Sequence, residues 1–311
     1  MIKILVFTAF NQAQQQKLKS GIPSGTQLIF NADLSTAELT EAFDTADIIL
    51  GNPPVHLFNT APAHLKFWQI DSAGFDQYQT LNLTIPVANM GAYFALGCAE
   101  TIVGGILCFY RQLHQLVRLQ TEKKWEGKEI RTRLQGLTHK RVLILGTGAI
   151  GLAVKQLLTG FNCQINTTAR KNPLADLHNF KEILTVLPEI DVVINTLPGT
   201  ATNYVSADFF EAMKPGSIYS NVGRGNTTAE KALLHALETG KIAGAILDVT
   251  TIEPLPKENK LWGMENVILT QHTGGGDGNE AEAKLKQLIS NVNNFIKGEP
   301  IHNIINLNQG Y

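Results

Sequence analysis

The sequence carries almost no excess charge of either sign. Its 311 residues include 26 Lys and Arg against 27 Asp and Glu, a formal net charge of -1. Proteins that bind nucleic acids or anionic membrane surfaces depend on clustered basic charge, so neither kind of partner is expected. A composition of 44% hydrophobic and 17% charged residues also excludes a disordered chain, a collagen and a small disulfide scaffold.

Cysteine is scarce as well, and no CxxC pair occurs. Cys98, Cys108 and Cys163 are an odd number in a long chain. This usage is typical of a reducing compartment, so we expect a cytoplasmic protein, and we expect no metal site. The apolar N-terminus MIKILVFTAF is short and lacks a cleavage pattern, which indicates a buried first strand rather than a signal peptide.

One hydrophobic run approaches the length of a membrane span. It covers residues 92–110, but Glu100 lies at its middle, where a carboxylate is costly in lipid. Gly97, Gly104 and Gly105 suit close packing inside protein. The run therefore predicts a buried helix at a domain or subunit contact, and basic side chains at helical spacing extend this helix to Gln120.

Apolar runs alternate with amphipathic segments over most of the chain, as in parallel sheets with crossover helices. At about 100 to 200 residues per domain the length predicts two domains. We expect an α/β fold of two Rossmann-like or flavodoxin-like domains, doubly wound parallel sheets with a cleft between them. Candidate strands are residues 3–7, 27–30, 47–50 and 66–70, then 141–145, 162–167, 192–195, 217–221, 244–247 and 267–269.

A glycine-rich turn follows the first strand of the second series. Gly146, Gly148 and Gly151 form GxGxxG between that strand and an amphipathic helix, 152–158. Gly146 allows the tight turn, Gly148 lets backbone approach a pyrophosphate, and Gly151 permits close packing of helix on strand. The helix N-terminus offers N–H groups to the phosphates. This context predicts a dinucleotide site; a glycine-rich turn without a ligand is the alternative.

The order of the two series predicts how the domains are assembled. The simplest arrangement makes residues 91–274 a contiguous dinucleotide-binding insert, while residues 1–90 and 275–311 form the substrate domain.

The cofactor expected at this turn is NADP(H). In such units an acidic residue about 20 positions after the first glycine binds the ribose 2′-hydroxyl of NAD. Here Ala169, Arg170 and Lys171 end the second strand, with no carboxylate until Asp176. Loss of the acid removes repulsion of a 2′-phosphate, and the two cations can pair with it. The alternatives are NAD(H), and solvated loop charges that bind nothing.

Three later strand ends carry polar residues in apolar surroundings, namely NVGRG at 221–225, DVTTIEP at 248–254 and TQH at 270–272. Ligands of open α/β sheets bind beyond the carboxyl ends of the strands, so these loops are expected to meet at one site. They bring together an anion binder, Arg224, a carboxylate, Glu253, and a proton carrier, His272.

The sequence resembles the D-isomer-specific 2-hydroxyacid dehydrogenases over nearly its whole length. The matching stretches are DSAGFD at 71–76, GTGAIG at 146–151, DVVINTLP at 191–198, MKPGS at 213–217, NVGRG at 221–225, AGAILDV at 243–249, Glu253-Pro254, Leu261-Trp262 and NVILTQH at 266–272. The resemblance implies hydride transfer between NADP(H) or NAD(H) and a 2-oxoacid or D-2-hydroxyacid, with Arg224, Glu253 and His272 as the catalytic residues.

The chemistry of this reaction asks for these residue types. Hydride addition to a 2-oxoacid leaves an alkoxide that needs a proton, and imidazole titrates close to physiological pH. A carboxylate paired with the imidazole favours its charged form, and a guanidinium binds the substrate carboxylate. The resemblance further implies substrate contacts from Ala73, Gly74, Arg224 and His272. It implies cofactor contacts from Gly146, Gly148, Ala149, Ile150, Gly151, Arg170, Lys171, Leu197, Pro198, Val222, Gly223 and Asp248.

Each site residue has a plainer interpretation. Arg224 between two glycines can be a turn residue, Glu253 an exposed loop acid and His272 a buried structural histidine; their matching order favours the enzyme. Two departures leave the loop shapes open. Gln271 stands where the family commonly has Pro, and the polar stretch 226–228 replaces a commonly acidic one.

Three other functions compete with this interpretation. They are a phosphoglycerate dehydrogenase-type activity, a cofactor-sensing corepressor that binds without turnover, and a methyltransferase, which leaves the Arg, Glu and His set unexplained. Substrate choice does not follow from the spacing, although Asn52, Pro53, Phe75 and Met90 are candidates near the cleft. By resemblance, we expect a homodimer through residues 91–125.

Overall fold

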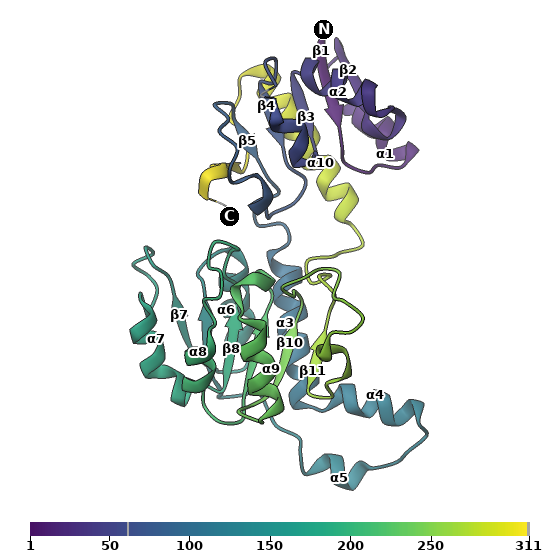
Figure 1. Ribbon diagram of the computed structural model, residues 1–311. Coiled ribbons are helices and arrows are strands. Elements are labelled where there is room, and N and C mark those ends of the chain that lie inside the picture. Colours follow the sequence, from purple (N-terminus) through teal and green to yellow (C-terminus); the bar gives the residue numbers. More distant parts are fainter. Residues whose placement is uncertain (61, 310–311) are drawn as a thin grey trace. The chain divides into compact units, whose positions relative to one another are not determined.

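The computed structural model describes residues 1–60 and 62–309. The chain divides into two compact units, one made of residues 1–93 with the chain from Asp277 onward, the other of Phe94–Gly276. In Figure 1 the purple N-terminal part and the yellow C-terminal part accordingly belong to the same unit, whereas the teal and green elements form the other. The second unit is one continuous segment of the chain.

The first unit contains a six-stranded sheet in the order β12-β5-β4-β3-β1-β2. All neighbours pair in parallel except β12, which runs antiparallel to β5. The strands are β1 (Ile2–Val6), β2 (Thr26–Phe30), β3 (Ile48–Leu50), β4 (Phe67–Gln69), β5 (Val87–Ala88) and β12 (Ile304–Ile305). The helices are α1 (Gln12–Gly21), α2 (Thr36–Thr45) and α10 (Glu280–Lys297).

Alternation along the strands gives this sheet two hydrophobic faces. Leu5 and Ile49 pack with α2 on one face, whereas Ile4 and Ile48 pack with α1 and α10 on the other. Both faces are covered, as parallel strands require. The C-terminal helix α10 therefore completes the core of a sheet that begins at the N-terminus.

The second unit contains a six-stranded, wholly parallel sheet in the order β11-β10-β9-β8-β6-β7. Its strands are β6 (Arg141–Leu145), β7 (Gln164–Thr168), β8 (Val192–Asn195), β9 (Ser217–Asn221), β10 (Ile242–Leu247) and β11 (Val267–Leu269). Its helices are α3 (Ala95–Tyr110), α4 (Leu113–Thr121), α5 (Gly127–Arg131), α6 (Ala149–Thr159), α7 (Phe180–Val186), α8 (Ala207–Ala212) and α9 (Glu230–Glu238).

Strand β6 lies at the point where the strand order of this sheet reverses. It pairs with β7 on one side and β8 on the other. Ligands of open α/β sheets bind at such a point. The GTGAIG turn directly follows β6, so the topology puts it at the expected binding position.

Helices cover both faces of the second sheet. Leu143 packs with α7, α8 and α9, whereas Val142 and Ile144 pack with α3 and α6. The long hydrophobic run largely forms α3, a buried helix as the sequence predicts, and this helix packs on the sheet of its own unit. A Cβ on Gly105 would lie 2.6 Å from Cγ2 of Ile246, so this glycine permits close contact of α3 with β10. Among the described residues, no helix is long and apolar enough to cross a membrane.

Two expectations about the elements are wrong. The helix predicted to extend to Gln120 ends at Tyr110, because Gln112 adopts a left-handed backbone conformation (φ 55°) and a separate helix, α4, begins at Leu113. The first sheet also contains β5 and β12, two strands that were not predicted from the sequence. Each has only two residues, too few for alternation to be visible.

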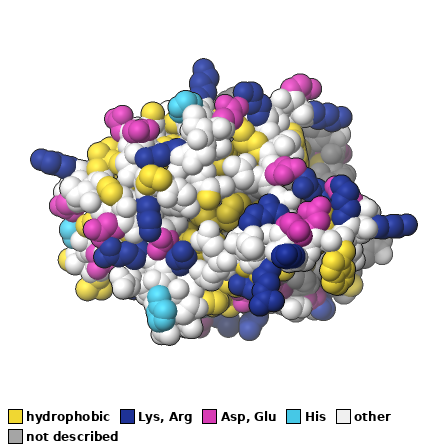
Figure 2. All heavy atoms as spheres, turned by 90° about the horizontal axis from the view of Figure 1, so that it is seen from below, with side chains coloured by type: hydrophobic (Ala, Val, Ile, Leu, Met, Phe, Trp, Pro, Cys, Tyr) yellow, Lys and Arg dark blue, Asp and Glu magenta, His cyan; other side chains and the backbone are white. Residues whose placement is uncertain are grey.

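The surface shows no concentration of one charge on the face seen in Figure 2. Basic and acidic side chains are interspersed there, with separate hydrophobic groups between them. This distribution agrees with the near-zero net charge of the sequence.

Candidate active site

The GTGAIG turn has the geometry of a phosphate-binding loop. Gly146 has φ 106°, which favours glycine, and a Cβ on Gly151 would lie 2.3 Å from the Gly146 carbonyl oxygen. Gly148 caps α6 without a side chain, and a Cβ built there meets no atom within 4 Å. Open space therefore lies beside the α6 N-terminus, where a pyrophosphate can approach the first N–H groups of Ala149 and Ile150.

The loop after β7 is tied to this turn. Asn172 Nδ2 donates to Thr147 Oγ1 at 3.0 Å, while Arg170 and Lys171 are exposed on the same loop. Asp176, the nearest following carboxylate, is engaged elsewhere, because its Oδ2 accepts from the Thr167 N–H and hydroxyl at 2.7 and 2.8 Å. The charges presented on this loop are therefore basic.

The loops after β8 and β9 interlock through a glycine. A Cβ on Gly223 would lie 2.4 Å from the Leu197 carbonyl oxygen, so the NVGRG loop packs directly against the loop of Leu197 and Pro198. Val222 is buried, whereas Arg224 is half-buried and donates from Nη1 to the Gly223 carbonyl at 2.8 Å. A side chain at position 223 would therefore clash with the neighbouring loop, and glycine there permits the close packing beside Arg224.

Glu253 and His272 form a hydrogen-bonded pair. Nδ1 of His272 lies 2.6 Å from Glu253 Oε2, and the other carboxylate oxygen accepts from the Thr250 N–H at 2.8 Å. The His272 side chain is 55% exposed and that of Glu253 35% exposed. Because one ring nitrogen of His272 is engaged with the carboxylate, the imidazole is oriented and Nε2 is left for chemistry.

Asp248 is a buried carboxylate that holds the histidine loop. Its Oδ1 accepts from Thr270 Oγ1 at 2.6 Å and from the N–H groups of Thr273 and Gly274 at 3.1 and 3.0 Å. Its carbonyl oxygen accepts from the His272 N–H at 2.5 Å. Both polar parts of Asp248 therefore fix the 270–274 backbone.

The histidine loop has an unusual backbone, and this explains one departure noted in the sequence. Gln271 and His272 have φ values of 54° and 56°, both left-handed. Proline is locked near −65°, so it cannot occupy position 271 in this conformation. The residue that replaces the commonly found Pro is thus matched to the turn that presents His272.

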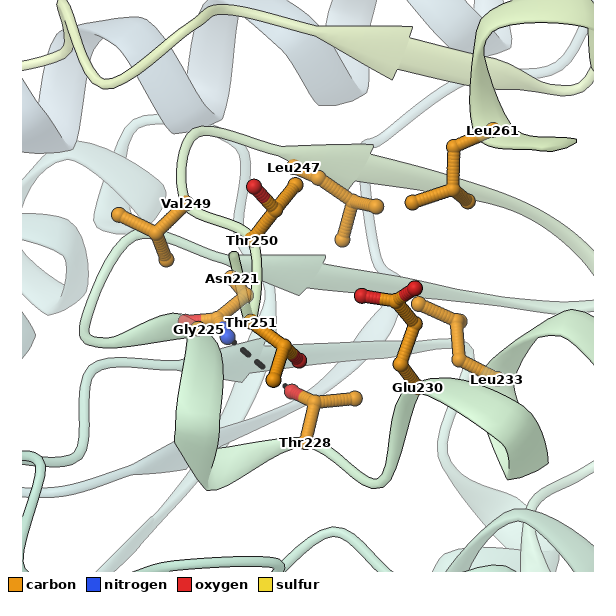
Figure 3. Close-up of a pocket in the computed structure, with 10 residues that line it drawn as sticks. All are labelled: Asn221, Gly225, Thr228, Glu230, Leu233, Leu247, Val249, Thr250, Thr251 and Leu261. Atoms are coloured by element: carbon orange, nitrogen blue, oxygen red, sulfur yellow. Dashed lines mark hydrogen bonds between the residues drawn. The ribbon is translucent and has the colours of Figure 1, made fainter. Parts of the chain in front are cut away.

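The Arg224 and Glu253 loops also touch. A Cβ on Gly225 would lie 1.8 Å from the Thr250 carbonyl oxygen. Figure 3 shows the pocket beside this contact, with Gly225, Thr250 and Thr251 at its wall. Its full lining is Asn221, Gly225, Thr228, Glu230, Leu233, Leu247, Val249, Thr250, Thr251 and Leu261. The three polar loops predicted from the sequence do come together, within the second unit.

The remaining predicted substrate contacts lie in the first unit. Ala73 and Gly74 follow β4 in a loop held by its own polar groups: Asn89 Nδ2 donates to the Ala73 carbonyl at 2.6 Å, and Ser72 Oγ to the Gly74 carbonyl at 2.7 Å. Asn52 Nδ2 donates to that serine at 3.1 Å. Phe75 and Met90 are buried core residues.

Several residues that shape the site were not singled out in the sequence. Thr270 and Thr250 support Asp248 and Glu253, and Asn172 links the two cofactor loops. In the sequence, only their position just after predicted strands indicated that they belong to the site. Cys98 is buried on α3, and burial raises the pKa of its thiol to about 11, which disfavours the nucleophilic thiolate. No group of three metal-ligating side chains occurs among residues 1–60 and 62–309.

Comparison with known proteins gives one consistent result. Residues 103–274 match the model of the "D-isomer specific 2-hydroxyacid dehydrogenase, NAD binding domain". A glyoxylate/hydroxypyruvate reductase B of Enterobacter sp. (strain 638) is 31% identical, with 88% of each chain covered. A probable 2-ketogluconate reductase of Dictyostelium discoideum is 29% identical over 97% of this chain and 95% of its own. Among solved structures, a D-isomer specific 2-hydroxyacid dehydrogenase family protein of Aeromonas salmonicida superposes with a TM-score of 0.83 at 26% identity, covering 98% and 99% of the two chains.

The left-handed turn at Gln271 leads to a prediction. Gln271→Pro cannot keep φ near 54° and should displace His272 from Glu253. With His272 as the general acid that the sequence predicts, turnover should fall about a hundredfold or more, the usual size of such a contribution. Gln271→Asn, which tolerates the left-handed region, should retain activity within a few fold. Steady-state kinetics of the two purified variants check this, and equal activity of Gln271→Pro and wild type would contradict it.

Proposed function

The chain belongs to the D-isomer specific 2-hydroxyacid dehydrogenase family and is therefore an NAD(P)-dependent oxidoreductase; from this premise we propose that it reduces a small 2-oxoacid to the D-2-hydroxyacid with His272 as general acid. The observation that carries the proposal is the Glu253–His272 pair on a loop next to that of Arg224. In the reverse direction the same imidazole acts as general base.

The second unit, residues 91–274 in the sequence-based division, is proposed to bind the dinucleotide. The open space at Gly148 and the free start of α6 suit the pyrophosphate. We assign to the cofactor site the first residues of α6 and residues of the loops after β8, β9 and β10, namely Ala149, Ile150, Leu197, Pro198, Val222, Gly223 and Asp248. When bound, the dihydronicotinamide supplies the hydride that adds to the carbonyl carbon.

The side chains of this unit supply the rest of the chemistry. Arg224 binds the substrate carboxylate and polarises the carbonyl through its guanidinium donors. As the carbonyl oxygen gains negative charge, His272 transfers the proton from Nε2 to it. Glu253, hydrogen-bonded to Nδ1, stabilises the charged imidazole before that transfer and orients the ring.

The first unit, residues 1–90 and 275–311, is proposed to complete substrate binding. The carbonyl groups of Ala73 and Gly74 each accept a side-chain hydrogen bond, which orients this backbone and suits N–H donors for a carboxylate. The names of two relatives, a glyoxylate/hydroxypyruvate reductase and a probable 2-ketogluconate reductase, support a polar 2-oxoacid as the substrate. Two alternatives predict no NADPH oxidation with a panel of unphosphorylated 2-oxoacids. They are a phosphoglycerate dehydrogenase-type substrate, and a corepressor that binds the cofactor without turnover.

The preferred cofactor is proposed to be NADP(H). Arg170 and Lys171 are exposed on a loop that Asn172 joins to the GTGAIG turn, and the nearest carboxylate is bound to Thr167. A 2′-phosphate there would meet the two cations, whereas Asp176 is engaged with Thr167.

We propose a homodimer through residues 91–125, because several apolar side chains of this segment are exposed. Leu113, Val117 and Trp125 are 49%, 62% and 97% exposed. Gln115 Nε2 donates to the Glu265 carbonyl at 3.1 Å, and Arg118 pairs with the Glu265 carboxylate, so α4 is held in place. A fixed apolar helix face of this kind is typical of a protein contact.

The general-acid role predicts the effect of His272→Gln. Turnover of glyoxylate or hydroxypyruvate should fall about a hundredfold to ten-thousandfold, while the Kd of the dinucleotide stays within twofold. His235→Gln, an exposed histidine on α9, is the matched control and should leave kcat unchanged. Near-normal kcat in His272→Gln would refute the assignment.

The cofactor proposal predicts a higher kcat/KM with NADPH than with NADH. Arg170→Glu should lower the NADPH to NADH ratio by about tenfold or more, because it removes a charge-assisted contact and adds repulsion. Lys231→Glu on α9 makes the same charge change away from the loop and should not alter the ratio. A wild-type preference for NADH would overturn the proposal.

The dimer proposal predicts twice the mass of one chain by light scattering. Val117→Glu with Trp125→Glu should shift the protein to the monomer mass, because charge is buried unpaired at the contact. Ile304→Glu, also at an exposed apolar residue but in the first unit, should leave the mass unchanged. A wild-type monomer at micromolar concentration would rule the dimer out.

A further inference from the structure

A cluster of buried polar side chains lies beneath the loop that carries Arg224. Its members, here called the Asn–Thr network, are Asn195, Tyr219, Asn221, Thr227 and Thr228, each 5% exposed or less. They come from the ends of β8 and β9 and from the turn after β9. Buried polar groups cost free energy unless each is hydrogen-bonded, so such a cluster calls for an explanation.

The network converges on one atom, the carbonyl oxygen of Arg224. Thr227 Oγ1 donates to it at 2.6 Å, Asn221 Nδ2 at 3.0 Å and the Thr227 N–H at 3.2 Å. This arrangement restrains the peptide that follows the Arg224 side chain. Rotation of that peptide would break all three hydrogen bonds together.

The other members of the network set the direction of the Thr227 hydroxyl. Asn195 Nδ2 donates to Thr227 Oγ1 at 2.8 Å and to Tyr219 Oη at 2.9 Å. Because an amide nitrogen can only donate, the Thr227 proton must point to the Arg224 carbonyl. Tyr219 Oη lies 2.6 Å from Thr228 Oγ1, which in turn accepts from Asn221 Nδ2 at 3.1 Å. Figure 3 shows this last bond beside Gly225.

The two asparagines also hold the neighbouring loops. Asn195 Oδ1 accepts from the Leu197 N–H and Asn221 Oδ1 from the Gly223 N–H, both at 3.0 Å. The same pair of side chains therefore links the loop after β8 with the loop after β9. Close packing of Gly223 on Leu197 leaves little room for either loop to adjust alone.

We propose that the Asn–Thr network positions Arg224 for the carboxylate of the 2-oxoacid, with Thr227 as its central positioning residue. The proposal rests on the proposed function, which places that carboxylate at Arg224. The fold does not need polar side chains at these positions for packing. Apolar groups of the same shape can replace a buried hydrogen-bonded pair with little loss of folding free energy. What the hydroxyl and amide groups add is a single orientation of the Arg224 backbone.

The test uses Thr227→Val, which keeps the shape and removes the hydroxyl. Oxamate, an unreactive analogue that keeps the carboxylate, is titrated into the full chain saturated with NADPH. The Kd of oxamate and the KM of the 2-oxoacid should rise about fivefold to tenfold, the size expected for one hydrogen bond. The Kd of NADPH should stay within twofold, and Thr227→Ser should restore oxamate binding.

Ser220→Ala is the matched control. This serine is fully buried on β9 between two network residues, but its hydroxyl donates to the Val193 carbonyl at 3.1 Å, outside the network. It should leave oxamate binding unchanged. Tyr219→Phe, which removes a hydroxyl from the far end of the network, should weaken oxamate binding in the same direction and serves if Thr227→Val does not fold.

The outcomes separate this inference from the function on which it rests. If folded Thr227→Val binds oxamate as tightly as wild type does, the network does not position Arg224. If Thr227→Val does not fold, the same result in Tyr219→Phe would overturn the proposal. So would equal weakening in Ser220→Ala. Arg224→Leu tests the proposed function by itself: if it binds oxamate as wild type does, the carboxylate is not held by Arg224.

Discussion

The site depends on backbone segments that approach too closely for any side chain to lie between them. Gly151 on Gly146, Gly223 on Leu197 and Gly225 on Thr250 each leave less than 2.5 Å for a Cβ, measured to the nearest backbone oxygen. The first contact closes the turn after β6, and the other two join the loops that follow β8, β9 and β10 at one edge of a parallel sheet. Since the glycines admit no other packing, the loops hold their functional groups as a single assembly.

Polar side chains then determine where each functional group points. Asp248 accepts from the Thr270 hydroxyl before His272 and from two backbone N–H groups after it, and Glu253 orients the imidazole ring. The Asn–Thr network does the same for the Arg224 carbonyl. The Asp248 carboxylate and the Arg224 carbonyl each accept several donors in buried or half-buried surroundings, where hydrogen bonds are strong and costly to break. Precise orientation therefore comes from hydrogen bonds, whereas close approach comes from glycine.

Much of this arrangement was predictable. Strand and helix positions follow from runs and periodicities that reflect burial, and most boundaries agree within two residues. The exceptions have local causes: the left-handed Gln112 interrupts a helix that composition alone would continue, and the two-residue strands β5 and β12 exist only through pairing with each other and with β4. Neither a backbone dihedral of a polar residue nor a short pairing leaves a periodic signal.

By itself, the sequence determined the family, the GTGAIG turn, and the residue types of the proposed chemistry, because these depend on the order and identity of residues along the chain. Only the tertiary structure decided which atoms meet. It showed that Nδ1 of His272 faces Glu253, that Asp176 is bound to Thr167, and that Asn221 and Thr227 donate to the Arg224 carbonyl. Hydrogen bonds between residues distant in sequence depend on how strands pair and loops pack, which no local pattern records.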